Sequence, residues 1–359
     1  MTSTEIRVAP QRLERNVGTM FAAAGCSTEE AGRVARYLVR ANLAGHDSHG
    51  VVRVPRYLAM LRDGLIFAGR TPAVVVDTPA LCVVDALFGF GQTAAPFAVE
   101  QGISRCRESG LAAVALRNAG HIGRVADWAE IAADAGLVSI HFVNAAGSVL
   151  VAPYGSTQRR FSTAPFCVGV PLPNRPPVLL DFATSVVAEG KVMVASLGGK
   201  PVPQDALIAP DGTIGNDPHM LYGDYGNDGK RNIKGGSGAL RAFGAHKGSG
   251  LALMCELLGG ALTGTGCASN ERRFANGMFS IYVDPKRVDP AEFFPAEALA
   301  FADHVKAAVP AKVGEETLLP GDPERRTAAE REAHGIPLSP DTWRALETAA
   351  RELGVDLTN

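Results

Sequence analysis

The spacing of hydrophobic and polar positions changes near residue 73 and divides the chain into two kinds of segment. In residues 9–43, apolar residues recur every three to four positions, which predicts two amphipathic helices. The second helix is expected to begin at Ser27 or Thr28, because two acidic residues follow in its first turn. Further helical patterns cover residues 54–61 and 340–353. The chain is therefore expected to begin as a helical unit.

Short runs of β-branched residues follow residue 73 and predict the buried strands of a sheet. The clearest runs and the helical patterns between them cover residues 74–76, 81–84, 95–108, 112–116, 125–135 and 138–143. Residues 251–262 form a helical segment that is almost wholly apolar, so it is expected to be deeply buried. Residues 205–240, rich in Gly, Asp and Asn, are expected to form a long loop or excursion, which in a compact domain is usually functional or an oligomer contact. These patterns predict an α/β or α+β second domain.

Composition indicates a protein of enzyme size and argues against several classes of partner. The chain has 359 residues, of which 46% are hydrophobic and 20% are charged, enough for two domains and a large core. The formal net charge is −2 and no Lys/Arg block occurs, so binding to nucleic acid or to an anionic membrane surface is not expected. The N-terminus lacks the apolar segment of a signal peptide, and no apolar run is long enough to span a bilayer. We therefore expect a cytoplasmic protein.

The six cysteines are spread singly along the chain, with no C-x-x-C pair among them. A chain of this length needs no disulfide framework, and no cysteine spacing suits zinc. We expect most of the cysteines to be small core residues and expect no metal site.

Residues 45–53 combine a proton carrier, a hydroxyl and a fixed cation. His49 has a side chain whose ordinary pKa lies near neutrality, so it can accept or return a proton at physiological pH. Arg53 keeps its charge, and its planar guanidinium matches a carboxylate through two hydrogen bonds. This combination favours chemistry on a small carboxylate. The alternative is that Ser48 is a turn residue and His49 a hydrogen-bonded surface histidine.

Residues 89–94 fit the G-x-G-x-x-A form of the dinucleotide-binding fingerprint, between a predicted strand and a predicted helix. In that fingerprint an acidic residue follows at the end of the next strand, whereas this chain has Leu116-Arg117-Asn118 there. An arginine could accept a 2′-phosphate. Both a Rossmann interpretation and a tight packing turn therefore remain open.

Glycines between a strand pattern and a helix pattern make residues 117–126 a more specific candidate for anion binding. Backbone N–H groups at the start of a helix attract phosphate, and Gly123 permits its close approach. Arg124 could add a charge-assisted contact. For His121, a structural role in capping the loop and a functional role are both open.

Three further loops, residues 161–165, 180–185 and 245–250, interrupt apolar runs with polar groups. Asp181 and the hydroxyl groups that follow it could hold a ribose or an amide. Lys247, beside glycines, suits a phosphate or a carboxylate. Taken singly, each loop is also consistent with a capped turn.

Five motifs occur in the order and approximate spacing of a known family: residues 42–50 (Asn-Leu-Ala-Gly-His-Asp-Ser-His-Gly), 120–124 (Gly-His-Ile-Gly-Arg), 181–185 (Asp-x-Ala-Thr-Ser), 246–248 (His-Lys-Gly) and 319–321 (Leu-Pro-Gly). Over nearly its full length the chain resembles the type-2 malate/L-lactate dehydrogenase family. That family includes sulfolactate and ureidoglycolate dehydrogenases and a branch that reduces cyclic imines. The resemblance implies that residues 89–94 are a packing turn rather than a dinucleotide site.

The same resemblance implies an architecture and an assembly. A non-Rossmann NAD(P)-binding domain with a mixed sheet, residues 73–304, is expected beside a helical domain built from both chain ends, residues 1–72 and about 305–359. The family also implies a homodimer. The partners that follow are a small 2-hydroxy or 2-oxo acid and NAD or NADP.

Roles carry over from the family residue by residue. His49 would exchange the substrate proton with support from Ser48, and Arg53 would bind the substrate carboxylate. His121 would flank the nicotinamide and the substrate, and Thr163 and Lys191 are expected to face the substrate. The residues expected to contact the cofactor, besides His49 and His121, are Gly123, Arg124, Val125, Leu180, Asp181, Phe182, Ala183, Thr184, Lys247, Asn276, Gly321, Asp322, Pro323 and Glu324.

The implied reaction is hydride transfer between NAD(P) and a 2-hydroxy carboxylate, class EC 1.1.1; the alternative is NADPH-dependent reduction of a cyclic imine carboxylate. Many relatives have Gly-Thr-Asn-Pro where this chain has Ser-Thr-Ala-Pro at residues 162–165, so a side-chain amide is lost. The imine branch places an acid where this chain has Lys191, and a cation there would repel an iminium substrate. This favours the hydroxy acids, with malate, lactate, 2-hydroxyglutarate and aryl hydroxy acids all remaining candidates.

Overall fold

The computed structural model describes residues 6–196, 198, 200–225, 231–233 and 235–357. In it, the N-terminal part of the chain folds into the predicted helices. Helices α1 (Pro10–Ala23) and α2 (Thr28–Leu43) pack on each other, and α2 begins where the sequence predicts because the Ser27 side chain accepts a hydrogen bond from the Glu30 N–H. Two short 3₁₀ turns, η1 (Asp47–His49) and η2 (Val51–Arg53), then lead into helix α3 (Val54–Arg62).

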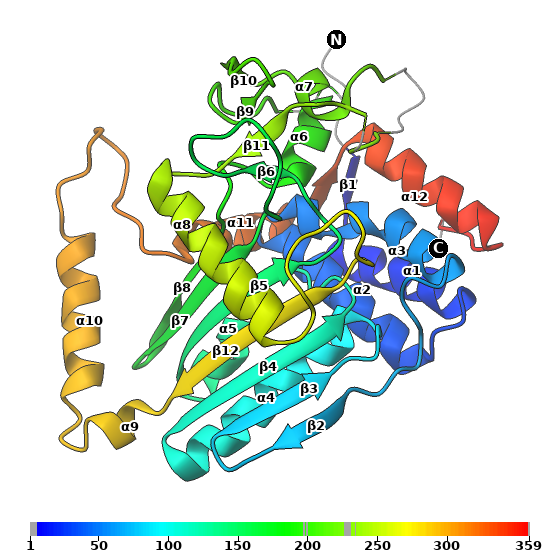
Figure 1. Ribbon diagram of the computed structural model, residues 1–359. Coiled ribbons are helices and arrows are strands. Elements are labelled where there is room, and N and C mark those ends of the chain that lie inside the picture. Colours follow the sequence, from blue (N-terminus) through cyan, green and yellow to red (C-terminus); the bar gives the residue numbers. More distant parts are fainter. Residues whose placement is uncertain (1–5, 197, 199, 226–230, 234, 358–359) are drawn as a thin grey trace.

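The two ends of the chain meet in this helical layer (Figure 1). Strand β1 (Ile6–Val8) pairs antiparallel with β13 (Ile336–Leu338). Helix α11 (Asp322–His334) contacts α2, and α12 (Pro340–Glu352) contacts α3. The shared core contains Leu13, Phe21, Leu38, Val51, Ile336 and Leu346, all buried. The expected domain boundary near residue 305 falls in α10 (Phe293–Lys306). Together with α9 (Pro285–Val288), this helix projects from the edge of the molecule (Figure 1). The exact limits of the two domains stay a prediction.

A seven-stranded mixed sheet forms the second layer, in the order β2-β3-β4-β12-β5-β7-β8. The strands are β2 (Ala73–Asp77), β3 (Leu81–Asp85), β4 (Leu111–Ala119), β5 (Val138–Ala145), β7 (Pro165–Leu172), β8 (Arg175–Ala183) and β12 (Asn276–Val283). Strands β3 and β4 run parallel, and the other neighbouring pairs are antiparallel. A mixed sheet therefore takes the place of the all-parallel sheet that a Rossmann interpretation requires.

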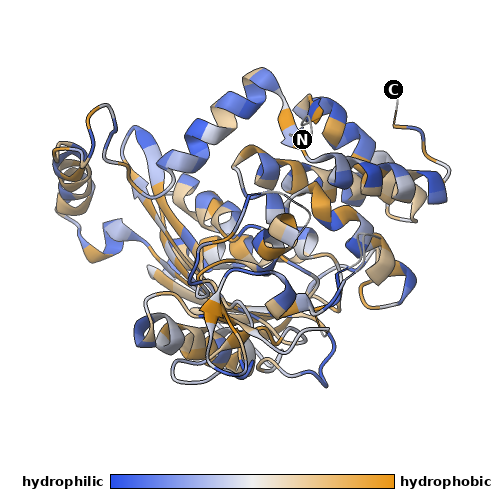
Figure 2. Ribbon diagram, turned by 90° about the horizontal axis from the view of Figure 1, so that it is seen from above, coloured by the Kyte–Doolittle hydropathy of each residue, from blue (hydrophilic) through white to orange (hydrophobic). Residues whose placement is uncertain are grey.

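Helices cover both faces of this sheet (Figure 1). Helices α4 (Gly91–Ser109) and α5 (Ala126–Asp134) lie on one face, and their contact buries Trp128 and Tyr282 fully. On the other face lies α8 (His246–Cys255), which continues as a π-helical turn, η3 (Glu256–Leu262). Viewed from above, the strands are largely hydrophobic and the outer helices carry hydrophilic positions (Figure 2).

The expectation that residues 251–262 are deeply buried is wrong for one side of the helix. Gly259 packs so closely on the sheet that an added Cβ would lie 2.7 Å from the Phe142 carbonyl oxygen. The opposite side faces outward, with Leu253 and Leu257 each 43% exposed and Leu262 59% exposed. An all-apolar helix can therefore present one face to the sheet and leave the other uncovered within a single copy of the chain.

Residues 205–240 do not form the long loop that the sequence predicts. This segment builds most of a small four-stranded sheet, in the order β10-β9-β11-β6. Its strands are β6 (Val151–Ala152), β9 (Leu207–Ile208), β10 (Ile214–Gly215) and β11 (Ala239–Arg241). Helices α6 (Glu189–Ser196) and α7 (His219–Tyr222) pack nearby around buried Leu207 and Leu221. The strands are too short to show a sequence period. Residues 226–230 and 234 of this segment lie outside the described residues.

None of the helices among residues 6–357, outside the gaps given above, is long and apolar enough to cross a membrane. In the same part of the chain, no group of three or more His, Cys, Asp or Glu side chains is arranged to hold a metal ion.

Candidate active site

Two cavities meet between the helical layer, the main sheet and α6. The larger has a volume of about 980 Å³ and the smaller about 90 Å³. Residues from all three elements line both cavities: His49, Gly123, Val125, Thr163, Pro165 and Ala188. The junction between the cavities is therefore the place where a group bound in one could meet a group bound in the other.

The segment before α3 is held in shape by a buried amide. The Asn42 side chain accepts a hydrogen bond from the Val51 N–H at 2.8 Å and donates to the Asp47 carboxylate at 2.6 Å. Gly50 passes so close that an added Cβ would lie 2.1 Å from the Asn42 oxygen. This packing explains why glycine follows His49, and it fixes the direction in which His49 and Arg53 leave the backbone.

His49 and His121 face each other at the junction, with ring centroids 5.5 Å apart and planes within 18° of parallel. The His49 Nδ1 lies 3.0 Å from the Ser48 hydroxyl oxygen. Burial lowers the pKa of both imidazoles well below the usual value, and the nearby Arg53 guanidinium lowers each of them further. Both rings are therefore neutral at physiological pH.

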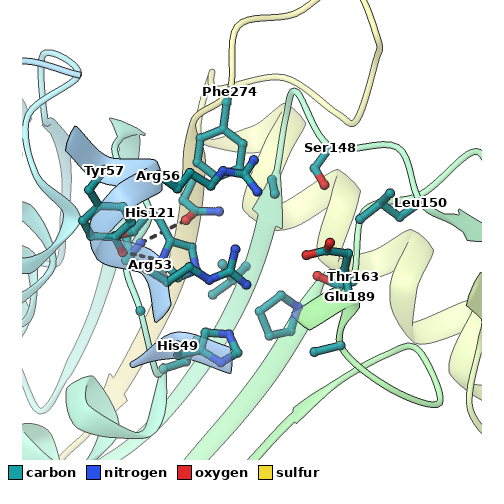
Figure 3. A pocket seen from close by; sticks show the side chains of 18 of the residues that line it. His49, Arg53, Arg56, Tyr57, His121, Ser148, Leu150, Thr163, Glu189 and Phe274 are labelled. Atoms are coloured by element: carbon teal, nitrogen blue, oxygen red, sulfur yellow. Dashed lines mark hydrogen bonds between the residues drawn. The ribbon is translucent and has the colours of Figure 1, made fainter. Parts of the chain in front are cut away.

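A chain of hydrogen bonds orients His121 from behind (Figure 3). The Tyr57 hydroxyl lies 2.6 Å from the His121 Nδ1, and the Gln92 amide donates to the Tyr57 oxygen at 3.1 Å. Burial raises the pKa of Tyr57 to about 12, so its hydroxyl keeps its proton. With Nδ1 engaged, the His121 Nε2 is the ring nitrogen left for the cavity.

Two arginines and one glutamate line the smaller cavity (Figure 3). Arg53 donates from Nε to the Ser48 carbonyl at 2.6 Å, which holds the side chain and leaves its terminal amino groups for the cavity. Arg56 lies over the Phe274 ring, 5.7 Å from its centroid. On the opposite wall, the buried Glu189 carboxylate accepts a hydrogen bond from the Tyr222 hydroxyl at 2.7 Å.

The larger cavity carries the residues expected to contact a dinucleotide. Those that line it are His49, Gly123, Arg124, Val125, Asp181, Phe182, Ala183, Pro323 and Glu324. It is also lined by Ser48, which was expected to support catalysis, and by Thr163 and Lys191, which were expected to face the substrate. Asn276 lines the smaller cavity, where its side chain accepts from the Ile122 N–H and donates to the Asn144 carbonyl. Asn276 therefore holds the loop of residues 120–125 against the sheet.

The donor groups around this cavity fit a nicotinamide dinucleotide. Within the described residues, no hydrogen bond to protein is seen for the N–H groups of Gly123, Arg124 and Val125, while the next N–H, that of Ala126, donates to the Asp181 carboxylate at 2.8 Å. The buried Arg124 Nε also has no partner in this part of the chain, although the guanidinium pairs with Asp127 at 2.9 Å. Unpaired N–H groups on a cavity wall suit an anionic or polar ligand.

Five of the expected cofactor contacts do not line either cavity: Leu180, Thr184, Lys247, Gly321 and Asp322. Thr184 is fully buried and its hydroxyl donates to the Thr163 and Ala164 carbonyls. Lys247 is exposed at the start of α8, and the Asp322 carboxylate is engaged by Lys306 and Arg325. Their expected roles stay predictions that this arrangement does not support.

Four residues of the site were not expected from the sequence: Arg56, Tyr57, Glu189 and Phe274. Two of them could have been found, because Arg56 and Tyr57 stand three and four positions after Arg53, and such positions share one face of a helix. Glu189 and Phe274 reach the cavity through tertiary packing that no local pattern signals.

Known proteins match this chain over almost its whole length. The family model for malate/L-lactate dehydrogenase matches residues 8–347. The chain belongs to the malate/L-lactate dehydrogenase family. This dehydrogenase is 39% identical to hydroxycarboxylate dehydrogenase B of Escherichia coli K12, over 97% of this chain and 95% of the relative. The resemblance given by the five motifs is thereby confirmed, and class EC 1.1.1 with a nicotinamide cofactor is what the family implies.

Other relatives show how far the family's chemistry extends. The dehydrogenase is 31% identical to a Δ¹-pyrroline-2-carboxylate/Δ¹-piperideine-2-carboxylate reductase of Pseudomonas putida, over 96% of this chain and 97% of the relative. A solved structure of an E. coli protein described as a malate/lactate dehydrogenase superposes with a TM-score of 0.89 at 39% identity, covering 98% of this chain and 96% of that one. The mixed α/β fold is thus the fold of the family.

Proposed function

We propose that this dehydrogenase interconverts a 2-hydroxy carboxylate and its 2-oxo acid with NAD or NADP. The observation that carries the proposal is the junction of the two cavities, where neutral His49 and His121 lie beside the free amino groups of Arg53. A carboxylate bound by Arg53 would place its neighbouring C2 hydroxyl between a fixed cation and the two neutral imidazoles.

The protein's part in the reaction is to bind, orient and move one proton. Arg53 binds the substrate carboxylate. The His49 Nδ1 lies 3.0 Å from the Ser48 hydroxyl oxygen, and in the tautomer that the reaction requires Nδ1 carries the hydrogen, so that Nε2 is ready to take the hydroxyl proton. The bound carboxylate offsets the positive charge of Arg53 and so raises the depressed pKa of His49, which favours proton uptake. In reduction, His49 returns that proton to the developing alkoxide.

The remaining requirements fall to the cofactor and to the wall of the larger cavity. When bound in the larger cavity, a nicotinamide would supply the hydride chemistry at C2. The unpaired N–H groups of residues 123–125 and the cationic side chains of Arg124 and Lys191 would hold its phosphates. His121, oriented by Tyr57, hydrogen-bonds the substrate oxygen from the other side.

A second candidate function is reduction of a cyclic imine carboxylate. Glu189 favours it, because a buried carboxylate in the smaller cavity could stabilise an iminium group. Lys191 opposes it from the wall of the larger cavity, and one oxygen of Glu189 is held by Tyr222. The hydroxy-acid reaction therefore remains the better supported of the two.

A panel of 2-oxo acids, assayed with NADH and NADPH in parallel and beside the two cyclic imine carboxylates, tests the proposal. We expect cofactor oxidation with at least one 2-oxo acid, at a kcat/KM above that of either imine. Turnover of the imines alone would establish the second candidate and reject the first.

A further inference from the structure

The smaller cavity holds a second guanidinium that the reaction itself does not use. Arg56 stands on the first turn of α3, three residues after Arg53, and therefore on the same face. Both side chains point into the cavity (Figure 3). A monocarboxylic substrate would occupy Arg53 and leave Arg56 without a function.

We propose that Arg56 binds a second anionic group of the substrate, so that this dehydrogenase prefers short 2-oxo and 2-hydroxy diacids over substrates with one carboxylate. This inference rests on the proposed hydroxy-acid reaction and narrows its substrate class. It assigns the specificity to a residue that stands outside the proton transfer.

The pairing of the two arginines that line the larger cavity supports this role. Arg124 pairs with Asp127, and Arg331, on the wall of the larger cavity, pairs with Asp47 at 2.6 Å. Arg56, by contrast, has no carboxylate within ion-pair distance and no hydrogen bond among the described residues. Its five N–H donors are therefore available to a ligand.

The charges on the cavity wall also favour an anionic ligand. Burial lowers the pKa of Arg56, and the nearby Arg53 guanidinium lowers it further. Glu189 is the acid among the described residues that line this cavity, and it hydrogen-bonds Tyr222 instead of closing onto Arg56. The two guanidinium groups outnumber this single carboxylate, so the cavity favours an anionic ligand, and a diacid can reach both guanidinium groups.

Phe274 gives Arg56 a defined position. The guanidinium carbon lies 5.7 Å from the ring centroid, within the range of a cation–π contact. This contact restricts the Arg56 side chain before substrate binds, which lowers the entropic cost of fixing a second carboxylate.

The test compares each diacid with a substrate of the same shape in which an uncharged isopropyl group replaces the second carboxylate. Oxaloacetate is matched with 4-methyl-2-oxopentanoate, and 2-oxoglutarate with 5-methyl-2-oxohexanoate. In the unmodified enzyme we expect kcat/KM to be at least about tenfold higher for one diacid than for its isostere, since a charge-assisted pair is worth about that factor or more.

Variants then connect that ratio to Arg56. Arg56→Gln should lower the diacid-to-isostere ratio of kcat/KM by about 10- to 100-fold, mainly through KM, and Arg56→Lys should restore part of it because the charge remains while the fork is lost. The matched control is Arg62→Gln, which changes an exposed arginine at the end of the same helix and should leave the ratio unchanged.

The outcomes separate the two proposals. Turnover of the isosteres as good as that of the diacids, or an Arg56→Gln variant with an unaltered ratio, would overturn the role of Arg56 and leave the hydroxy-acid reaction standing. No turnover of the four acids, with turnover of another 2-oxo acid of the panel, would overturn the role of Arg56 alone. No turnover of any 2-oxo acid with either cofactor would overturn both. Because the ratio in the unmodified enzyme is itself decisive, a variant that fails to fold does not remove the test.

Discussion

At the scale of single residues, the two imidazoles of the site differ in what holds them. His121 is fixed through Tyr57 and Gln92, whereas His49 is held by one short contact with Ser48 and lies on the wall of both cavities. A proton acceptor must face the substrate and still release its proton afterwards. His49, with its unengaged Nε2 and its place at the junction, meets that requirement best.

Replacing His49 with alanine should lower kcat by about 10²–10⁴-fold, because the acid/base group is lost while the carboxylate and cofactor sites remain. Steady-state kinetics with the best 2-oxo acid of the panel give the number. His304→Ala, which removes an exposed histidine on α10, is the matched control and should keep full activity. A loss below tenfold for His49→Ala, together with a larger loss for His121→Ala, would transfer the proton role to His121.

At the scale of elements, the glycine-rich turn before α4 has a packing role. Within the described residues, neither glycine of the turn lines a cavity, and a Cβ on Gly91 would lie 2.4 Å from the His121 carbonyl oxygen. The start of α4 therefore presses directly against the backbone that carries His121. This contact gives residues 89–94 their glycines, without any dinucleotide in the turn.

Gly91→Ala should therefore destabilise the protein by about 1–3 kcal/mol and lower activity, because the added methyl group must displace the backbone of His121. Urea unfolding and kcat/KM measure the two effects. Gly32→Ala is the control, since a Cβ at this position in α2 meets nothing within 4 Å and should stabilise the helix by about 0.5–1 kcal/mol. Equal stability of the two variants would contradict the packing role of the turn.

At the scale of the whole molecule, the buried histidines connect stability to pH. His141 lies inside the main sheet between the Ser139 and Ser280 hydroxyls, and burial lowers its pKa to about 3. His49 and His121 are also buried and neutral. An unfolded histidine binds a proton near its ordinary pKa of 6.5, whereas the folded protein keeps these three rings neutral. The contribution of these neutral rings to the free energy of unfolding is therefore fully present above about pH 6.5 and is lost as the pH falls below that value.

The free energy of unfolding should accordingly fall between pH 6.5 and pH 3, by up to about 1.4 kcal/mol per pH unit for His141 alone. Urea unfolding at pH 7, 6 and 5 measures the slope. His141→Asn removes the titrating ring but keeps a polar side chain between the two serines, so its stability should depend less steeply on pH. Identical slopes in the two proteins would show that His141 does not contribute.

The homodimer that the family resemblance implies belongs to the same scale and stays a prediction. Apolar side chains along α8 and η3, including Leu257 and Leu262, are exposed in a single copy of the chain. The projecting helix α10 likewise exposes Phe293 and Phe301.

The sequence by itself determined the parts of this protein that depend on neighbours along the chain. Apolar spacing placed α1, α2, α3 and four strands of the main sheet, β2, β3, β4 and β5, and Ser27 marked the start of α2 through its side-chain cap. The motif of residues 45–53 brought a histidine and an arginine together because only a few residues separate them. Local hydrogen bonds and the helical period are sufficient for such inferences.

Only the tertiary structure decided what depends on contacts between distant segments. Glu189 and Phe274 reach the smaller cavity from opposite sides, and the small sheet forms because its short strands find partners far along the chain. Thr184 turned inward, and Lys247 lay outside both cavities, although their motifs matched the family. A side chain's neighbours across the fold are set by packing, which the order of residues along the chain does not reveal.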